Sequence, residues 1–368
     1  MSRSLILRTA ASALRTHRLD YLIFFVTSRC NARCRMCFNY RVLDKYNGRD
    51  DLSLEEIEKI ADRIPRLLQL TLSGGEPFLR DDLFEIVGAF ARKSQLGQLT
   101  LTTNGLAPDR VEALFSKIVK NFPELSINFD ISLDAVGAAH DAIRGVDGAY
   151  DRAVETWRRV QSLKGRYRNF RLGVTAVLSS FNLDEIFPLL EKLDSEFVLD
   201  RCEVMLARGQ TREPSAVDVP LERFEKVHEW LNEHNHDLAH SLTGRFLYQL
   251  SRRKREIEIQ TAKEDRMILP CVAGTKMAVL DADGTVRPCE IIHTLYPDKD
   301  LTLGALRSAD YDLPGIMNSE KARNVGDFIR RTQCYCTFEC AILAGLVFQP
   351  RQWPRLGVRA LGGVRHIW

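Results

Sequence analysis

The chain has 368 residues, of which 45% are hydrophobic and 27% are charged, and both shares are ordinary for a globular protein. The formal net charge of +3 is small for this length, so the composition excludes a strongly basic protein and predicts no nucleic-acid partner. The sequence contains no run of about 18 apolar residues, which a membrane-spanning helix needs. It also lacks the pattern of a cleavable export signal, and we therefore expect a cytoplasmic protein.

Residues 1–20 form the first predicted element, a basic amphipathic segment. A helix here would place Leu7, Ala11 and Leu14 on one face and Arg8, Arg15 and Arg18 elsewhere. Such a segment can make peripheral contact with an anionic membrane surface. The alternative is that it packs against the rest of the protein.

From residue 21 to about 207, short strand-like runs alternate with amphipathic helical patterns. The expected strands cover 21–28, 67–74, 96–103, 125–134, 170–179 and 197–206. Two helix starts are marked, one by the capping box of Ser53 and Glu56 and one by Pro108 in a first turn. Six strand–helix units are fewer than the eight of a closed barrel. The sequence therefore predicts an α/β fold, an open partial (β/α)6 TIM-like barrel over 21–207, with functional residues at the C-terminal ends of the strands.

Three further segments complete the predicted organisation. Residues 208–266 are expected to form a helical bridge, with "RRKRE" (252–256) on a solvated face. Residues 267–345 are expected to form a second, smaller module, in which Asp283-Gly284 predicts the turn of a β-hairpin. Residues 346–368 form a basic apolar tail containing Trp353 and Trp368, with the same two alternatives as residues 1–20.

The nine cysteines fall into two groups and one isolated residue. Cys30, Cys34 and Cys37 form the first group; Cys271, Cys289, Cys334, Cys336 and Cys340 form the second. In a reducing cytoplasm such groups are more typical of metal ligands than of disulfides. We therefore expect two metal sites, and we expect Cys202, within an apolar strand, to be a small core residue.

The first group has the spacing C-x3-C-x2-C and directly follows the first expected strand. Thiolates are soft ligands that select zinc, Cu(I) or iron–sulfur clusters. A structural zinc ion needs a fourth ligand, and this loop contains no histidine. In a four-iron cluster, three cysteines leave one iron open for an exogenous ligand.

This motif after a first strand resembles the signature of the radical S-adenosylmethionine (radical SAM) superfamily. "SGGEP" (73–77), with Gly74, Gly75 and Glu76, is similar to the glycine-rich motif whose backbone receives the methionine amino group of SAM. The resemblance also implies SAM contacts for five side chains near later strand ends: Ser132, Asp134, Arg144, Ser179 and Asn182. Alternative roles are a helix cap for Glu76, a surface salt bridge for Arg144 and purely structural roles for Ser132 and Asp134.

The second group resembles the C-terminal auxiliary-cluster extension called SPASM, or its shortened form, Twitch. Cys271, Gly284 and Cys289 give C-x12-G-x4-C, and "CYCTFEC" (334–340) supplies the other three thiols. The full pattern uses seven cysteines for two clusters, whereas five are present here. The resemblance therefore implies a small α+β domain with one auxiliary 4Fe–4S cluster and one spare thiol, and it leaves the choice between Cys334 and Cys336 open.

The resemblance implies an enzyme, an oxidoreductase or a related radical-based modifying enzyme. SAM at the open iron would be cleaved by one electron to a 5′-deoxyadenosyl radical, which abstracts a hydrogen atom from a substrate. The auxiliary cluster would assist electron transfer or bind substrate, and no catalytic side chain is implied beyond the SAM-binding cluster. Expected partners are a reductant such as flavodoxin or ferredoxin and a small-molecule, peptide or lipid-linked substrate. The alternative is a non-catalytic zinc-thiolate scaffold.

Overall fold

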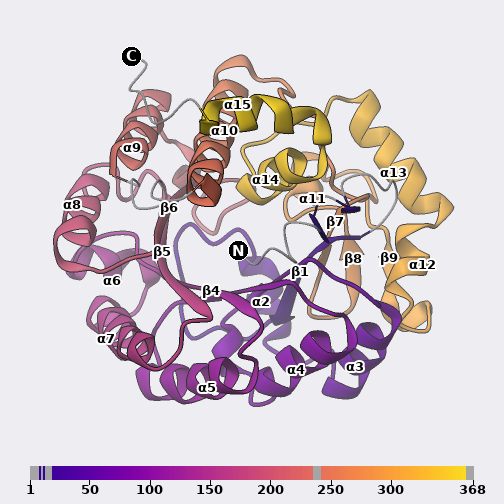
Figure 1. Cartoon of the computed structure of the whole chain (residues 1–368), viewed down its shortest axis with the longest axis horizontal. Helices are drawn as coiled ribbons and strands as arrows, with labels where there is room; N and C mark the ends of the chain where they lie inside the picture. The colour runs from indigo at the N-terminus through magenta and orange to yellow at the C-terminus, as the bar shows by residue number, and fades with distance from the viewer. Residues whose placement is uncertain (1–7, 10, 13–18, 235–241, 362–368) are drawn as a thin grey trace.

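The computed structural model describes residues 8–9, 11–12, 19–234 and 242–361 (Figure 1). A curved sheet forms its centre, and helices cover the outer face of that sheet. The barrel strands are β1 (Tyr21–Thr27), β2 (Gln69–Gly74), β3 (Gln98–Thr103), β4 (Ser126–Ser132), β5 (Phe170–Leu178) and β6 (Arg201–Leu206). Each strand pairs in parallel with the next, so all six expected strands are present.

Helices lie between these strands because each crossover between parallel strands must return along the outer face. They are α2 (Tyr40–Tyr46), α3 (Leu54–Arg63), α4 (Leu83–Lys93), α5 (Pro108–Asn121), α6 (Ala138–Arg144), α7 (Ala149–Ser162) and α8 (Ile186–Glu196). The predicted capping box is formed: Ser53 accepts from the Glu56 amide, and Glu56 accepts from the Ser53 amide. Alternate strand residues such as Leu70, Leu72 and Leu101 are fully buried in the core beneath these helices.

The C-terminal module shares the sheet of the barrel. Its strands are β7 (Met277–Leu280), β8 (Thr285–Arg287) and β9 (Gly304–Ala305), and the strand order is β6-β5-β4-β3-β2-β1-β7-β8-β9. β7 pairs in parallel with β1, and β7 and β8 form the predicted hairpin, with Gly284 at φ +91° in its turn. The sheet does not close, since β6 and β9 stand at its two ends. These observations confirm the partial barrel with a small α+β domain.

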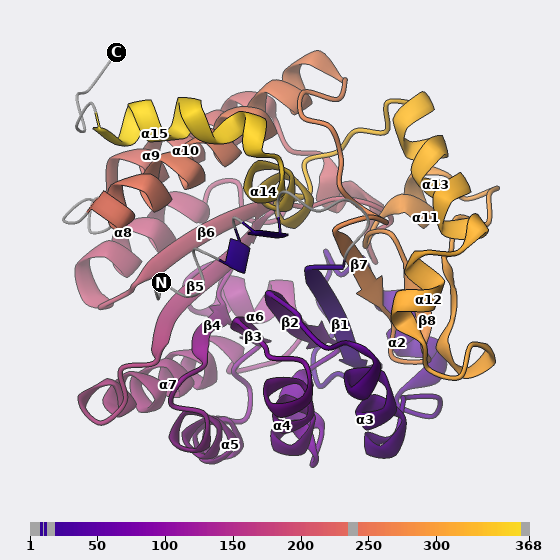
Figure 2. The same ribbon diagram turned by 45° about the vertical axis from the view of Figure 1, so that its right-hand side comes forward.

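Short helices and one longer helix complete this module on the right of Figure 2. They are α11 (Ile292–Leu295), α12 (Leu313–Met317) and α13 (Glu320–Arg331). Residues such as Leu306, Leu313 and Val325 pack into the same core as the barrel, which ties the module to the sheet.

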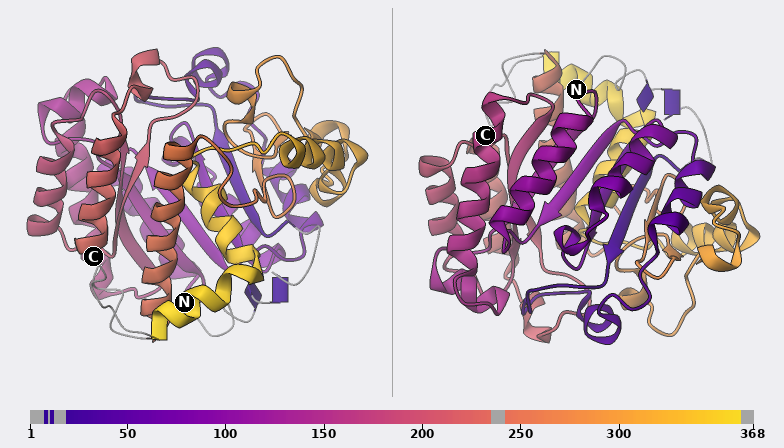
Figure 3. Two further views of the ribbon diagram at one scale, coloured as in Figure 1. Left: turned by 90° about the horizontal axis from the view of Figure 1, so that it is seen from above. Right: turned by 90° about the horizontal axis from the view of Figure 1, so that it is seen from below.

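A further set of helices lies on the open side of the barrel, as seen from above in Figure 3. They are α9 (Leu221–His234), α10 (Leu242–Glu264), α14 (Glu339–Phe348) and α15 (Trp353–Leu361), and α10 packs against the other three. The prediction of a solvated face at 252–256 is wrong for Lys254 and Arg255, which are 5% and 2% exposed. Lys254 Nζ binds Glu203 Oε2 at 2.7 Å, and Arg255 donates to Asn232, so β6 and α9 supply partners for the two cations.

The chain ends differ in how much of them the structure describes. Leu356 and Ala360 of α15 are buried, while Val358 is 71% exposed, so most apolar contacts of this helix face the protein. Leu7, Leu14, Arg15, Arg18 and Trp368 lie outside the described residues. Within the described ranges, every helix is too short or too polar to cross a membrane.

Candidate functional site

The first cysteine group lies in the loop between β1 and α2, at the C-terminal end of the first strand. Backbone hydrogen bonds fix this loop against α6: the Arg33 amide donates to the Arg144 carbonyl at 2.9 Å, and the Arg35 amide donates to the Ile143 carbonyl at 3.0 Å. On the other side, the Arg212 amide donates to the Cys37 carbonyl at 3.0 Å. Two distant segments therefore hold the loop in place.

The thiols of this loop have the surroundings of thiolate ligands. The Ala32 backbone amide donates to Cys30 Sγ, and the Asn39 backbone amide donates to Cys37 Sγ. In both cases the donor lies two residues after the cysteine. Burial, opposed by these amides and reinforced by the neighbouring Cys34 thiol, raises the pKa of Cys30 to about 11 and that of Cys37 to about 12. Buried thiols of this kind lose their protons when a metal centre binds them. A three-thiol set with donated amides fits a cluster that leaves one iron open.

Gly74 is the last residue of β2, and Gly75 follows it, beside this loop. The Gly75 amide donates to the Thr27 carbonyl at 2.8 Å, and the Glu76 amide donates to the Arg29 carbonyl at 2.8 Å. A Cβ atom built on Gly75 would overlap the carbonyl oxygen of Arg29 and lie 3.2 Å from Cys30 Cβ. Only glycine permits this approach of two backbone segments, and it brings the glycine-rich motif directly against the cysteine loop.

Glu76 is buried and satisfied by the protein. Its carboxylate accepts from the Phe78 amide at 3.1 Å, the Thr103 hydroxyl at 2.9 Å and the Asn104 amide at 2.7 Å. The first of these is the capping role that we considered as an alternative to a SAM contact. Glu76 thus joins the ends of β2 and β3.

Asn104 is a site residue that the sequence analysis missed. Its Nδ2 donates to Asn31 Oδ1 at 2.8 Å and points to Cys30 Sγ at 4.0 Å. The signal available in the sequence was "TTNG" (102–105), a polar residue followed by glycine at the end of a strand. Its contact with the cysteine loop depends on β2 and β3 being neighbours, which is a tertiary feature.

Glu76 also predicts a pH dependence of stability. Burial, opposed by the three donors, raises the pKa of Glu76 to about 7. Since the folded carboxyl holds its proton more tightly than the unfolded one, its stabilising contribution is present below pH 4.5 and is lost as the pH rises to about 7. We expect Glu76→Gln to reduce the slope of unfolding free energy against pH by up to about 1.4 kcal/mol per pH unit. Urea unfolding between pH 4.5 and 7 measures the difference; parallel curves for the two proteins would contradict it.

Arg144 and Asp134 form a buried ion pair next to the cysteine loop. Arg144 Nε lies 2.7 Å from Asp134 Oδ2, and their side chains are 9% and 0% exposed. Arg144 Nη1 also donates to Cys34 Sγ at 3.6 Å. The fold therefore brings these two predicted residues together, but as partners of each other and of a cysteine. The alternative of a surface salt bridge for Arg144 is wrong, because the pair is buried.

The remaining predicted side chains lie at the ends of β4 and β5. Ser132 is half-buried in the last position of β4. Asn182 Oδ1 accepts from the Ser179 amide at 2.8 Å, and Asn182 Nδ2 donates to the Asp134 carbonyl at 2.8 Å. Ser179 and Asn182 are buried, and they stabilise the strand ends. Their predicted contacts with SAM stay predictions.

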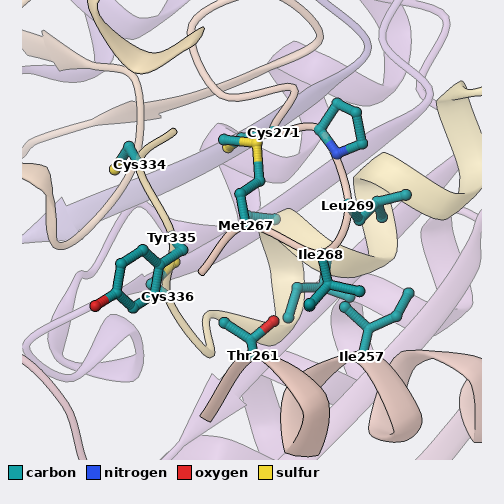
Figure 4. A pocket seen from close by; sticks show the side chains of 12 residues that line it. Ile257, Thr261, Met267, Ile268, Leu269, Cys271, Cys334, Tyr335 and Cys336 are labelled. Carbon is teal, nitrogen blue, oxygen red and sulfur yellow. The ribbon is translucent and has the colours of Figure 1, made fainter. Parts of the chain in front are cut away.

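The second group of thiols is spread over the C-terminal module. Cys271, Cys334 and Cys336 line one pocket together with apolar residues of α10 and α14 (Figure 4). Cys289 is buried just after β8. Cys340 lies in the first turn of α14. Cys202, 9% exposed in β6, is the core residue that we predicted.

No three His, Cys, Asp or Glu side chains in the described parts of the chain are close enough together to hold a single metal ion. A four-iron cluster does not require that arrangement, since each thiolate binds a different iron atom.

Two regions of the chain match known families. Residues 24–193 match the radical SAM superfamily, and residues 271–341 match SPASM, an iron–sulfur cluster-binding domain. Both ranges lie inside the segments 21–207 and 267–345; the exact domain boundaries stay predictions.

Curated relatives and solved structures agree with these matches. The chain is 31% identical over 180 residues to pre-heme d1 synthase of Dinoroseobacter shibae, covering 48% of this chain and 41% of that protein. It is 26% identical over 283 residues to AdoMet-dependent heme synthase of Methanosarcina barkeri, and this match covers 73% of this chain and 76% of that protein. The chain spans about half the length of several curated relatives that it matches. Its fold is similar to that of anSMEcpe with bound AdoMet, with a TM-score of 0.59 and 16% sequence identity. The match covers 94% of this chain and 96% of that chain.

The open parallel sheet, the thiol loop at the end of its first strand and the second thiol group in a module on the same sheet all agree with both matches. The chain therefore belongs to the radical SAM superfamily and is an enzyme that carries a SAM-binding 4Fe–4S cluster and a C-terminal SPASM-type auxiliary cluster domain.

Proposed function

We propose that this protein uses SAM to abstract a hydrogen atom from a substrate held inside the partial barrel. The observation that carries this proposal is the placement of exactly three cysteines on one loop at the end of β1, beside Gly74 and Gly75. The cluster and SAM together would supply a 5′-deoxyadenosyl radical by one-electron reductive cleavage. Cys30, Cys34 and Cys37 would hold the cluster.

The other residues of the site act by positioning. Backbone carbonyl groups at Gly74 and Gly75 would receive the amino group of SAM, since these two glycines lie directly against the segment that carries the cysteines. Asp134 orients Arg144, whose guanidinium donates to Cys34 and carries further N–H groups toward the loop. Asn104 and Glu76 join β3 to β2 and thereby fix the wall opposite Cys30.

The inner face of the barrel supports a polar substrate. Because strand residues alternate between faces, the residues between the buried outer leucines point inward. Among them, Thr102 Oγ1 donates to Ser73 Oγ at 3.2 Å, and Arg201 Nη1 lies 3.4 Å from Asp130 Oδ2. A Cβ atom at Gly173 would overlap both Arg201 and Asp130, so glycine leaves the space for this pair. We infer that the substrate, whether a small molecule, a peptide or a lipid-linked molecule, presents hydroxyl or charged groups to this wall.

Anaerobic reconstitution tests the proposal. The reconstituted protein is expected to form 5′-deoxyadenosine from SAM with dithionite or with reduced flavodoxin, and none when SAM or the reductant is left out. The control is the triple variant Cys30→Ala, Cys34→Ala and Cys37→Ala, which is expected to form none. Equal product from the triple variant would overturn the proposal, as would a colourless protein that holds zinc alone. Pools of candidate substrates are then compared by the increase in 5′-deoxyadenosine that each one causes.

A further inference from the structure

Three ionisable side chains meet on the open side of the barrel. Arg208 follows β6, Glu290 follows β8, and Glu339 begins α14, one of the helices on this side (Figure 3). Arg208 Nη1 lies 2.7 Å from Glu339 Oε2, and Arg208 Nη2 lies 3.3 Å from Glu290 Oε2. We call these three residues the Arg208 triad, and the mechanism proposed above gives them no role.

The Arg208 triad holds two carboxylates and one cation. Among the described residues, Arg208 is the sole side-chain cation that pairs with Glu290 or Glu339. Arg287 also approaches Glu290, but it donates to the backbone carbonyl and is paired with Asp281. The three side chains of the triad are only 11–15% exposed. A charge in such surroundings costs free energy unless a counter-charge offsets it, so the triad favours a cationic ligand.

The two carboxylates of the triad differ in what they accept. Both oxygens of Glu339 accept from Arg208, and the buried ring of Phe338 lies 4.6 Å from the guanidinium, so Arg208 is held firmly. Glu290 is 8% exposed and accepts from Arg208 through Oε2. Its other oxygen, Oε1, has no donor among the described residues. Buried polar atoms nearly always have a hydrogen-bond partner, so this oxygen indicates an acceptor for a ligand.

The Arg208 triad lies at the end of the barrel that carries the first thiol loop. Arg208 comes after the C-terminal end of β6, and four residues later the Arg212 amide donates to the Cys37 carbonyl at 3.0 Å. Four residues span at most about 14 Å, which limits the distance between the triad and this loop. Glu290 and Glu339 each adjoin a cysteine of the second group. A substrate bound at this end of the barrel therefore meets the triad.

The arrangement favours an organic cation over a metal ion. A metal ion needs several ligand side chains around one point, and the described ranges contain no group of three His, Cys, Asp or Glu side chains placed in this way. The Arg208 guanidinium between the carboxylates also repels a divalent ion. An ammonium group needs only acceptors, and it can donate up to three hydrogen bonds.

We propose that the Arg208 triad binds an ammonium group of the substrate. Glu290 Oε1 accepts from the ammonium group, Glu339 supplies the second negative charge, and Arg208 positions both carboxylates. The substrate class is a primary amine, carried by a sugar-like molecule or by a peptide. The inference rests on the proposed function, because it names the class of substrate that this site takes.

Equilibrium binding tests the inference without turnover. The protein is the reconstituted full chain with SAM, kept anaerobic and without reductant, and saturation-transfer NMR measures the binding of two probe sets. Glucosamine, methyl glucoside and glucuronate are the cationic, neutral and anionic sugars; alanine N-methylamide, N-acetylalanine N-methylamide and N-acetylalanine are the peptide counterparts. We expect the cationic member of at least one set to bind most tightly, and that set identifies the carrier of the amine. Binding of neither amine, or equal binding of a neutral or anionic counterpart, would overturn the inference.

The variant Glu290→Gln keeps the shape of the side chain and removes its charge. We expect it to weaken binding of the cationic probe at least about tenfold, which is the effect of one hydrogen bond between charged groups. The control is Asp300→Asn, in an exposed ion pair of the same module, and it should bind the probe as the wild type does. Equal affinity in Glu290→Gln and the wild type would contradict the assigned acceptor.

Urea unfolding of the cluster-free chain separates ligand binding from a structural role. Because Glu339 holds Arg208 through both oxygens, Glu339→Gln should lower the unfolding midpoint. Glu290→Gln removes the excess negative charge and should leave the midpoint unchanged or raise it. An equal loss in both variants would show that the triad is purely structural. Neither measurement requires cleavage of SAM, so a failure to form 5′-deoxyadenosine contradicts the proposed function and not this inference.

Discussion

Replacement of Gly75 by alanine is expected to abolish 5′-deoxyadenosine formation. The added Cβ would overlap the Arg29 carbonyl oxygen and press on Cys30, and both of these belong to the loop that carries the three thiols. A backbone oxygen cannot rotate away as the end of a flexible side chain can, so the loop itself must move. A displacement of about 1 Å at a reacting centre costs roughly a hundredfold in rate. We therefore expect at least that loss, together with reduced iron content in the first site.

The matched control for this substitution is Gly326→Ala. Gly326 lies within α13, far from the thiol loop in the sequence, and a Cβ there meets open space. Since alanine favours a helix over glycine, this variant should be as active as the wild type and more stable by about 1 kcal/mol. Iron content, 5′-deoxyadenosine formation and urea unfolding are measured for both. Wild-type iron content and activity in Gly75→Ala would show that the loop does not depend on this close approach.

Replacement of Asp134 by alanine is expected to lower the free energy of unfolding by about 3–5 kcal/mol. The substitution leaves the buried Arg144 guanidinium without its carboxylate, which lies 2.7 Å away and is itself 0% exposed. Burial lowers the pKa of Arg144, but the nearby Asp134 and Cys34 raise it by more, so the guanidinium stays charged. Without the Asp134 carboxylate, the free-energy cost of removing this charge from water would no longer be compensated. Urea unfolding of the cluster-free chain measures this loss without interference from bound metal.

Two controls separate the loss of a buried partner from the loss of any ion pair. Asp300→Ala removes the partner of Lys321 in a pair whose side chains are 67% and 45% exposed, and it should cost less than about 1 kcal/mol. The double variant Asp134→Leu with Arg144→Met removes both charges and should recover most of the stability. If Asp134→Ala were no more costly than Asp300→Ala, the pair would not be buried in solution.

Much of the barrel could be predicted because its determinants are local. Short apolar, strand-like runs marked all six strands, and Ser53 with Glu56 marked a helix start that forms as expected. The C-x3-C-x2-C spacing identified the first site, because three soft ligands on one short loop are themselves a local feature. The Asp283-Gly284 turn was equally local, since it depends on a positive φ that glycine permits.

The partners of charged residues could not be read from local pattern. "RRKRE" has the composition of a solvated face, yet Lys254 and Arg255 are buried because Glu203 and Asn232 come from β6 and α9. In the same way, Asn104 reaches Cys30 only because β3 lies beside β2. Each of these contacts joins residues 20 or more positions apart, and side-chain pairs at such separations leave no periodic signal.

The sequence by itself determined which chemistry the protein carries: eight of the nine cysteines in two groups, a glycine-rich strand end and a partial barrel to hold them. Only the tertiary structure decided how the site residues are used. It paired Asp134 with Arg144, placed Glu76 as a link between strands, and put the C-terminal hairpin on the edge of the barrel sheet. The physical reason is that the role of a charged or polar side chain depends on which donors and acceptors surround it, and these are supplied by segments that meet only in the folded chain.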